Sequence, residues 1–221
     1  LSTDTLGSKS VAIGEQALKT QNFTTATDGY NVAVGRLAGQ AITTSIQHTI
    51  IGGLAGDALT TGEKNTVVGF NALTADTTGD RTVAIGHSAL YTQNFTGGQI
   101  TYNTAVGFEA AYNLTTGVQN TFIGYQAGTG ATNPSYTVAV GEGALGGATL
   151  TGSYNTAVGR VAGNAMTSGA NNTLIGYAAG QAMVDGVNNV LVGSGTGDAL
   201  TDADNNTAVG YNALGAEIQG D

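Results

Sequence analysis

A chain of 221 residues with 36 glycines, no tryptophan and only 6% aromatic residues has few large side chains with which to fill one thick core. Its charge is sparse and acidic, with 6 basic and 15 acidic residues, which argues against nucleic acid or an anionic membrane surface as a main partner. The absence of cysteine excludes disulfides, thiolate metal sites and cysteine nucleophiles, and no apolar run is long enough to span a membrane. Because the chain begins at Leu1 without Met or a signal-peptide pattern, we expect it to be a fragment or a processed piece of a protein.

One short motif ending in glycine recurs along the whole chain. "NTAVG" occurs at 103–107, 155–159 and 206–210, with near-copies such as "NTVVG" at 65–69. The terminal glycine returns with a 17-residue period, as from Gly52 to Gly69, except that one step is one residue longer and two steps are four residues longer. Residues 1–221 are therefore expected to form a single repeat domain. The repeat glycines are Gly14, Gly35, Gly52, Gly69, Gly86, Gly107, Gly124, Gly141, Gly159, Gly176, Gly193 and Gly210.

The two longest steps correspond to enlarged coils at 15–34 and 87–106. They carry the closely similar segments "ALKTQNFT" (17–24) and "ALYTQNFT" (89–96), which are separated by four units of the repeat. The pattern indicates duplication of a block of four units, one of them enlarged.

Each unit contains one short strand just before its glycine. The residue before the glycine is Val or Ile, and the third residue before it is Val or Thr, so these β-branched side chains share one strand face. We interpret this face as the core of the coil. The core-repeat residues are Val34, Ile51, Val68, Ile85, Val106, Ile123, Val140, Val158, Ile175, Val192 and Val209.

The opposite strand face is apolar too. An apolar strand on both sides needs cover on both sides, and a thin coil has no spare layer. We expect self-association through this face; the alternative is a wider coil that packs two sheets of its own. The candidate interface residues are Ala33, Ile50, Val67, Ala84, Ala105, Phe122, Ala139, Ala157, Leu174, Leu191 and Ala208.

The turns of the repeat have their own signals. Gly, and once Pro134, often stands seven residues before the repeat glycine, which marks a turn. Asn recurs four residues before it and is expected to form a ladder of stacked amides. The unit is too short for a helix pair. The predicted fold is all-β: a parallel β-solenoid, or β-roll, of about twelve 17-residue coils, assembled as a homotrimeric rod.

Catalytic and metal chemistry have little support. The only histidines, His48 and His87, have neither cysteines nor clustered carboxylates beside them, so the sequence predicts no enzyme, no cofactor and no metal site. The stretch "TDADNNT" (201–207) lacks the glycine and final glutamate of a calcium loop. An ice-binding solenoid would need a regular Thr-x-Thr array, whereas Thr alternates with Val here.

Aromatic residues are the candidates for receptor contact. Phe108 and Tyr125 directly follow repeat glycines, and Phe23 and Phe95 are expected at the tips of the two insertions. Such rings can stack on sugars. The alternative is that they pack between subunits or cover the corners of the coil.

The units "NTAVGYNALG", "NTLIGYAAGQA" and "NTAVGRVAGNA" resemble the head repeats of YadA-type trimeric adhesins and, more closely, the NTAIGYxAG repeats of bacteriophage tail-fibre proteins. The resemblance covers almost the whole chain, although the repeat unit of the adhesin heads is shorter than the unit of this chain. It implies a homotrimer of parallel β-rolls located in the virion or at the cell surface.

The resulting functional hypothesis is a structural or adhesive segment of a virus tail fibre that spaces or presents a host-receptor-binding tip. The expected partners are two further copies of the chain and a cell-surface glycan or protein, with no nucleic acid and no membrane insertion. The alternative is a passenger segment of a cell-surface trimeric adhesin or a self-assembling extracellular filament.

Overall fold

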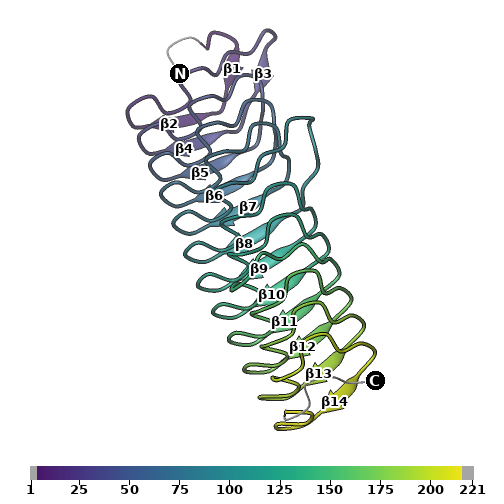
Figure 1. Ribbon diagram of the computed structural model, residues 1–221. Helices are drawn as coiled ribbons and strands as arrows, with labels where there is room; N and C mark the ends of the chain where they lie inside the picture. Colours follow the sequence, from purple (N-terminus) through teal and green to yellow (C-terminus); the bar gives the residue numbers. More distant parts are fainter. Residues whose placement is uncertain (1–3, 216–221) are drawn as a thin grey trace. The chain divides into compact units, whose positions relative to one another are not determined.

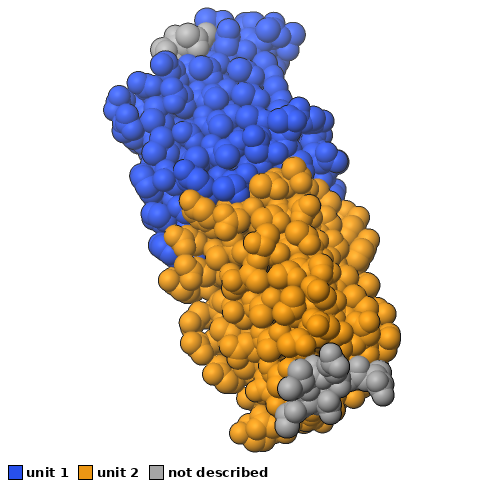
Figure 2. All heavy atoms as spheres, viewed as in Figure 1, with its two compact units in different colours: residues 1–108 blue, residues 109–221 orange. Residues whose placement is uncertain are grey.

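The computed structural model describes residues 4–215, and this range contains short parallel strands and no helix (Figure 1). The chain divides into two compact units, Leu1–Phe108 and Glu109–Asp221 (Figure 2). Each unit is a β-solenoid in which every coil adds one strand to a parallel sheet, with about twelve coils in the two units. This confirms the predicted all-β solenoid of about twelve turns.

In the first unit, successive three-residue strands pair in register. For example, Val32, Ala33 and Val34 lie beside Thr49, Ile50 and Ile51. A separate two-stranded sheet pairs β1 with β3. The strands are β1 (Gly7–Ser8), β2 (Val11–Ile13), β3 (Thr27–Asp28), β4 (Val32–Val34), β5 (Thr49–Ile51), β6 (Thr66–Val68), β7 (Val83–Ile85) and β8 (Thr104–Val106).

The second unit repeats the same arrangement without the small sheet. Its strands again pair in chain order and in register, as Thr156 and Thr173 do across β11 and β12. The strands are β9 (Thr121–Ile123), β10 (Val138–Val140), β11 (Thr156–Val158), β12 (Thr173–Ile175), β13 (Val190–Val192) and β14 (Thr207–Val209).

The two faces of the strands are the reverse of the sequence-based expectation. The middle residue of each strand from β4 to β14, expected at a subunit interface, points into the coil and is almost completely buried. This inward set is Ala33, Ile50, Val67, Ala84, Ala105, Phe122, Ala139, Ala157, Leu174, Leu191 and Ala208. The residue before each glycine, expected in the core, lies on the outer face and is half-buried or exposed. This outward set is Val34, Ile51, Val68, Ile85, Val106, Ile123, Val140, Val158, Ile175, Val192 and Val209.

The reversal follows from the width of the coil. A coil of only about 17 residues encloses a narrow interior. Alanine, the commonest middle residue, fits this interior because its side chain is small. Larger middle residues are compensated locally. Phe122 is fully buried, and a Cβ atom added to Gly128 would collide with its ring. Gly180 similarly leaves room for Leu174, since an added Cβ atom would lie 3.0 Å from Cδ2 of the leucine.

The repeat glycines are required by both conformation and stacking. Gly141 has φ 128°, which is disfavoured for residues with a side chain. A Cβ atom there would lie 2.6 Å from the carbonyl oxygen of Gly159 on the next coil. The glycine therefore lets consecutive turns approach at the spacing of a β-sheet.

The expected asparagine ladder is present and buried. In the second unit, Nδ2 of Asn172 donates to Oδ1 of Asn155 (3.1 Å), and Asn189 donates in the same way to Asn172 (3.0 Å). Each amide also donates to a turn carbonyl, such as that of Gly186 from Asn172 (2.7 Å). The ladder thus satisfies carbonyl groups that the strand pairing leaves free.

Candidate functional site

The outer face of the strands is a regular uncharged surface, with a row of Val and Ile beside a row of Thr and Val. Each coil contributes two β-branched side chains to it, and none of these positions carries a charge in the described coils. Ile51 is 40% exposed and Ile123 is 39% exposed, so this face is not covered within the chain. A row of Val and Ile side chains that are half-buried or exposed at every coil is unusual on a surface that has no partner.

A second surface is the column of residues that directly follow the repeat glycines, called here the plate column because most of its side chains are planar. In the first unit, Nε of Arg36 lies 3.2 Å from a carboxylate oxygen of Glu15. Phe70, His87 and Phe108 form a stack with ring-centroid distances of 5.5 and 5.2 Å. Gly53 alone contributes no side chain to this part of the column.

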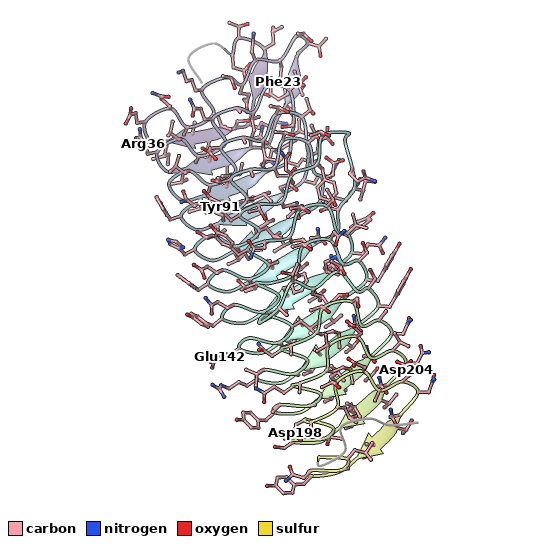
Figure 3. All side chains as sticks on the ribbon, in the orientation of Figure 1. Phe23, Arg36, Tyr91, Glu142, Asp198 and Asp204 are labelled. Carbon is pink, nitrogen blue, oxygen red and sulfur yellow. The ribbon has the colours of Figure 1, made fainter. Side chains whose placement is uncertain are left out.

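The plate column of the second unit has the same character. Arg160 pairs with Glu142 at 3.2 Å, and its guanidinium lies 5.8 Å from the ring centre of Tyr177. Ser194 follows on the next coil and interrupts the stack before Tyr211. Figure 3 shows Arg36 and Glu142 at turns that project from the body of the solenoid.

A third column lies five residues before each glycine, at a corner where the backbone has positive φ. It includes the stacked pair Tyr136 and Tyr154, with ring centres 5.0 Å apart. It also includes Lys9, whose pKa is raised by its hydrogen bond to Asp28, and Arg81, which lies over the ring of Tyr102. These contacts stabilise the corner, because each ring or cation rests on its neighbour in the next coil.

The expectation that Phe23 and Phe95 lie at the surface is wrong. Phe23 (labelled in Figure 3) is 4% exposed and Phe95 is 5% exposed, so neither ring is available to a receptor in this chain. The insertions fold inward because each adds apolar volume to the interior of its coil. Phe108 and Tyr125 lie at the surface as expected, at 42% and 53% exposure.

Each insertion also brings a chain of hydrogen-bonded Asp, Gln and Asn side chains that the sequence analysis missed. This chain is called the polar relay below. In the second enlarged coil, Nε2 of Gln93 donates to Asp76 (2.7 Å), and Oε1 of Gln93 accepts from Asn103 (2.9 Å). The backbone N–H of Phe95 donates to the same aspartate (3.1 Å). Burial raises the pKa of Asp76, although these hydrogen bonds oppose the shift.

The first enlarged coil contains the matching relay. Gln21 donates to Asp4 (2.6 Å) and accepts from Asn31 (2.8 Å). Burial acts to raise the pKa of Asp4, but the hydrogen bond from Gln21 and several backbone N–H groups together lower it. The signal was available in the sequence: an aspartate stands one full repeat before the glutamine of each "TQNFT".

The two histidines lie in different surroundings. His48 is buried in the asparagine ladder and His87 is held between two phenylalanine rings. Among residues 4–215, no group of three or more His, Asp or Glu side chains could hold a metal ion. No helix in this range is long and apolar enough to cross a membrane.

Comparison of the chain with family models, curated proteins and solved structures finds no match.

Proposed function

We propose that the chain is a structural and adhesive segment of a virus tail fibre, and that it assembles as a homotrimer through the outer face of its strands. The observation that carries the proposal is the uncharged row of β-branched side chains on that face, which includes Ile51, Val68, Ile123 and Ile175. Covering such a surface removes apolar area from water and stabilises the assembly.

A further copy of the same chain fits this face best. The row repeats at about 4.8 Å, the strand spacing of a sheet. A partner remains in register along the row only if it has the same repeat, which another copy supplies. Three such rows facing a common axis cover one another, and the resemblance to trimeric adhesin heads and virus fibres favours three copies.

The fold supports a structural role. Within each unit, backbone hydrogen bonds join each coil to the next, and in many coils the buried amide ladder does so as well. A repeated coil of this kind places surface side chains at fixed intervals, so the segment can both space and present contacts. The exposed aromatic rings Phe108 and Tyr125 supply adhesive contacts in this proposal.

The test is the solution mass of the whole chain measured by light scattering. We expect about 66 kDa for three chains of 21.9 kDa. Replacing Val68 and Val158 together with Arg should give monomers that keep the β-sheet circular dichroism, because charges on the outer face cannot be covered. Asp202→Arg, at an exposed turn, is the matched control and should remain trimeric. A wild-type chain that is monomeric at tens of micromolar would refute the proposal.

A further inference from the structure

We infer that the interruption of the plate column at Ser194 is a binding slot for one neutral sugar ring, held between Tyr177 and Tyr211. This inference deepens the proposed function, because it gives the fibre segment a ligand class and a binding site of its own. It depends on residues of the second unit alone, where Ser194 stands between two tyrosines of the column.

Backbone hydrogen bonds place the three residues on consecutive coils. The N–H of Gly195 donates to the carbonyl of Tyr177 (2.8 Å), and the N–H of Asn212 donates to the carbonyl of Ser194 (3.0 Å). These bonds follow the register in which β12, β13 and β14 pair. The two tyrosines therefore leave the backbone two coils apart, which corresponds to about 9.6 Å.

Both walls of the slot are accessible. Tyr177 is 53% exposed and Tyr211 is 80% exposed. Arg160 lies on one side of Tyr177, with its guanidinium 5.8 Å from the ring centre, and Ser194 lies on the coil at the other side. Where no member is missing, neighbouring rings fill the one-coil interval, as Phe70 and His87 do at 5.5 Å. At Ser194 a single hydroxymethyl group replaces a ring.

The width of the slot favours a puckered ring over a flat one. Carbon atoms in contact lie about 3.5–4.0 Å apart, so a flat aromatic ring between two others spans only about 7–8 Å. A pyranose chair is thicker than a flat aromatic ring, so it fits better between two tyrosine rings that are about 9.6 Å apart. Its C–H groups contact the tyrosine faces, while its hydroxyls reach water and the hydroxyl of Ser194.

The charges of the column favour a neutral sugar. Arg160, the cation next along the column, is already paired with Glu142 at 3.2 Å and packed on Tyr177. An acidic sugar would need a cation without a partner to offset the loss of its hydration. The slot instead offers two ring faces and a neutral hydroxyl.

The corresponding interruption in the first unit is different. A Cβ atom at Gly53 would lie 3.4 Å from Cδ2 of Phe70, so the phenylalanine ring occupies part of the vacant place. The residue on its other side is Arg36, paired with Glu15, rather than a second aromatic ring. The slot is therefore assigned to Ser194 alone.

The experiment is saturation-transfer difference NMR on the whole chain, with methyl β-glucopyranoside, methyl β-galactopyranoside and methyl N-acetyl-β-glucosaminide as probes. We expect transfer to the ring C–H protons of at least one glycoside. Ser194→Tyr fills the slot with a residue that the column already contains at position 177, and Tyr211→Ala removes one wall. Each should weaken binding about tenfold. Tyr154→Ala, in the intact stack at the other corner, should leave binding unchanged.

Three results would overturn the inference: no transfer to any of the three glycosides, binding that persists in Ser194→Tyr, or binding of phenol at the slot in preference to the glycosides. Light scattering on the same samples separates this inference from the proposed function. A trimer that ignores the sugars would refute the slot alone. A monomer that binds them through Tyr211 would refute the trimeric assembly and retain the slot.

Discussion

His48 replaces an asparagine in the buried ladder and accepts the backbone N–H of the next ladder residue, Asn65, as an asparagine would. Its Nδ1 accepts the backbone N–H of Asn65 (3.3 Å), as the side-chain oxygen of Asn155 accepts the N–H of Asn172 (3.0 Å). Its Nε2 lies 3.0 Å from the hydroxyl of Ser45. The acceptor role of Nδ1 requires the neutral imidazole, because a protonated ring has no acceptor.

Acid should therefore destabilise the protein through His48. Burial lowers the pKa of His48 from 6.5 to about 4; nearby Glu63 opposes this shift and Lys64 adds to it. Below pH 6.5 the unfolded chain binds a proton that the folded chain does not bind until about pH 4. Stability is thus full above pH 6.5 and falls as the pH drops toward 4, by at most about 3 kcal/mol.

The measurement is urea unfolding at pH 7 and pH 4.5 for the wild type and His48→Asn. The variant restores the ladder residue and should lose less stability between the two pH values. Burial raises the pKa of Asp57 and Asp76, which acts in the opposite direction in both proteins and cancels in the comparison. Equal losses in the two proteins would show that His48 does not carry the effect.

The relay through Gln93 should be more important than its copy through Gln21. Gln93→Ala leaves the buried Asp76 carboxylate without its side-chain donor, and we expect a loss of about 2–3 kcal/mol. Gln21→Ala is the matched control, because its partner Asp4 is less buried and water can replace the lost hydrogen bond. Thermal unfolding of both variants tests the difference, and equal losses would contradict the importance assigned to burial.

Gly141→Ala should be strongly destabilising. The added methyl group is disfavoured at φ 128° and meets the carbonyl oxygen of Gly159, so the coils must separate locally. We expect a loss of more than about 2 kcal/mol. Gly97→Ala, where a Cβ atom has nothing within 4 Å, should change stability by less than about 0.5 kcal/mol. Comparable denaturation midpoints for the two variants would contradict this explanation of the repeat glycine.

The loss of stability caused by Gly128→Ala should be reduced when Phe122 is replaced as well. Gly128→Ala alone brings a methyl group into the phenylalanine ring, whereas Ala111 occupies the equivalent place of the preceding repeat with φ 53°. Combining Gly128→Ala with Phe122→Ala removes the collision, because alanine is the middle residue of most coils and leaves space for the added methyl group. A double-mutant cycle should give a favourable coupling of about 1–3 kcal/mol. Strictly additive losses would show that the two positions do not share one space.

Much of the fold could be predicted from the sequence because the repeat is strict. The strand positions, the parallel pairing and the asparagine ladder follow from a motif that returns at a nearly constant interval. The direction of the strand faces could not be read from the motif, since both faces are apolar. The structure decides it, because a Cβ atom at Gly128 would collide with the ring of the buried Phe122.

The candidate surfaces were predictable only in part. Phe23 and Phe95 belong to insertions, and insertions are usually exposed loops. Here Gln93 and Asp76 supply a polar relay inside the enlarged coil, which allows the segment to fold inward. The slot at Ser194 cannot be recognised from one 17-residue repeat. It arises because Ser194 has no ring, whereas the coils on both sides of it carry one.

The central claim is that the outer face of the strands, rather than the middle residues, joins the chains. Oxidative cross-linking tests it most directly, because the chain has no cysteine and a single substitution reports one position. Val158→Cys should give disulfide-linked pairs of chains under native conditions, since the outer face meets its copies at the axis. Gly97→Cys, on an exposed loop, should give only the background of random collisions. Ala157→Cys cross-linking more efficiently than Val158→Cys, or no cross-linking above background at Val158, would contradict the account.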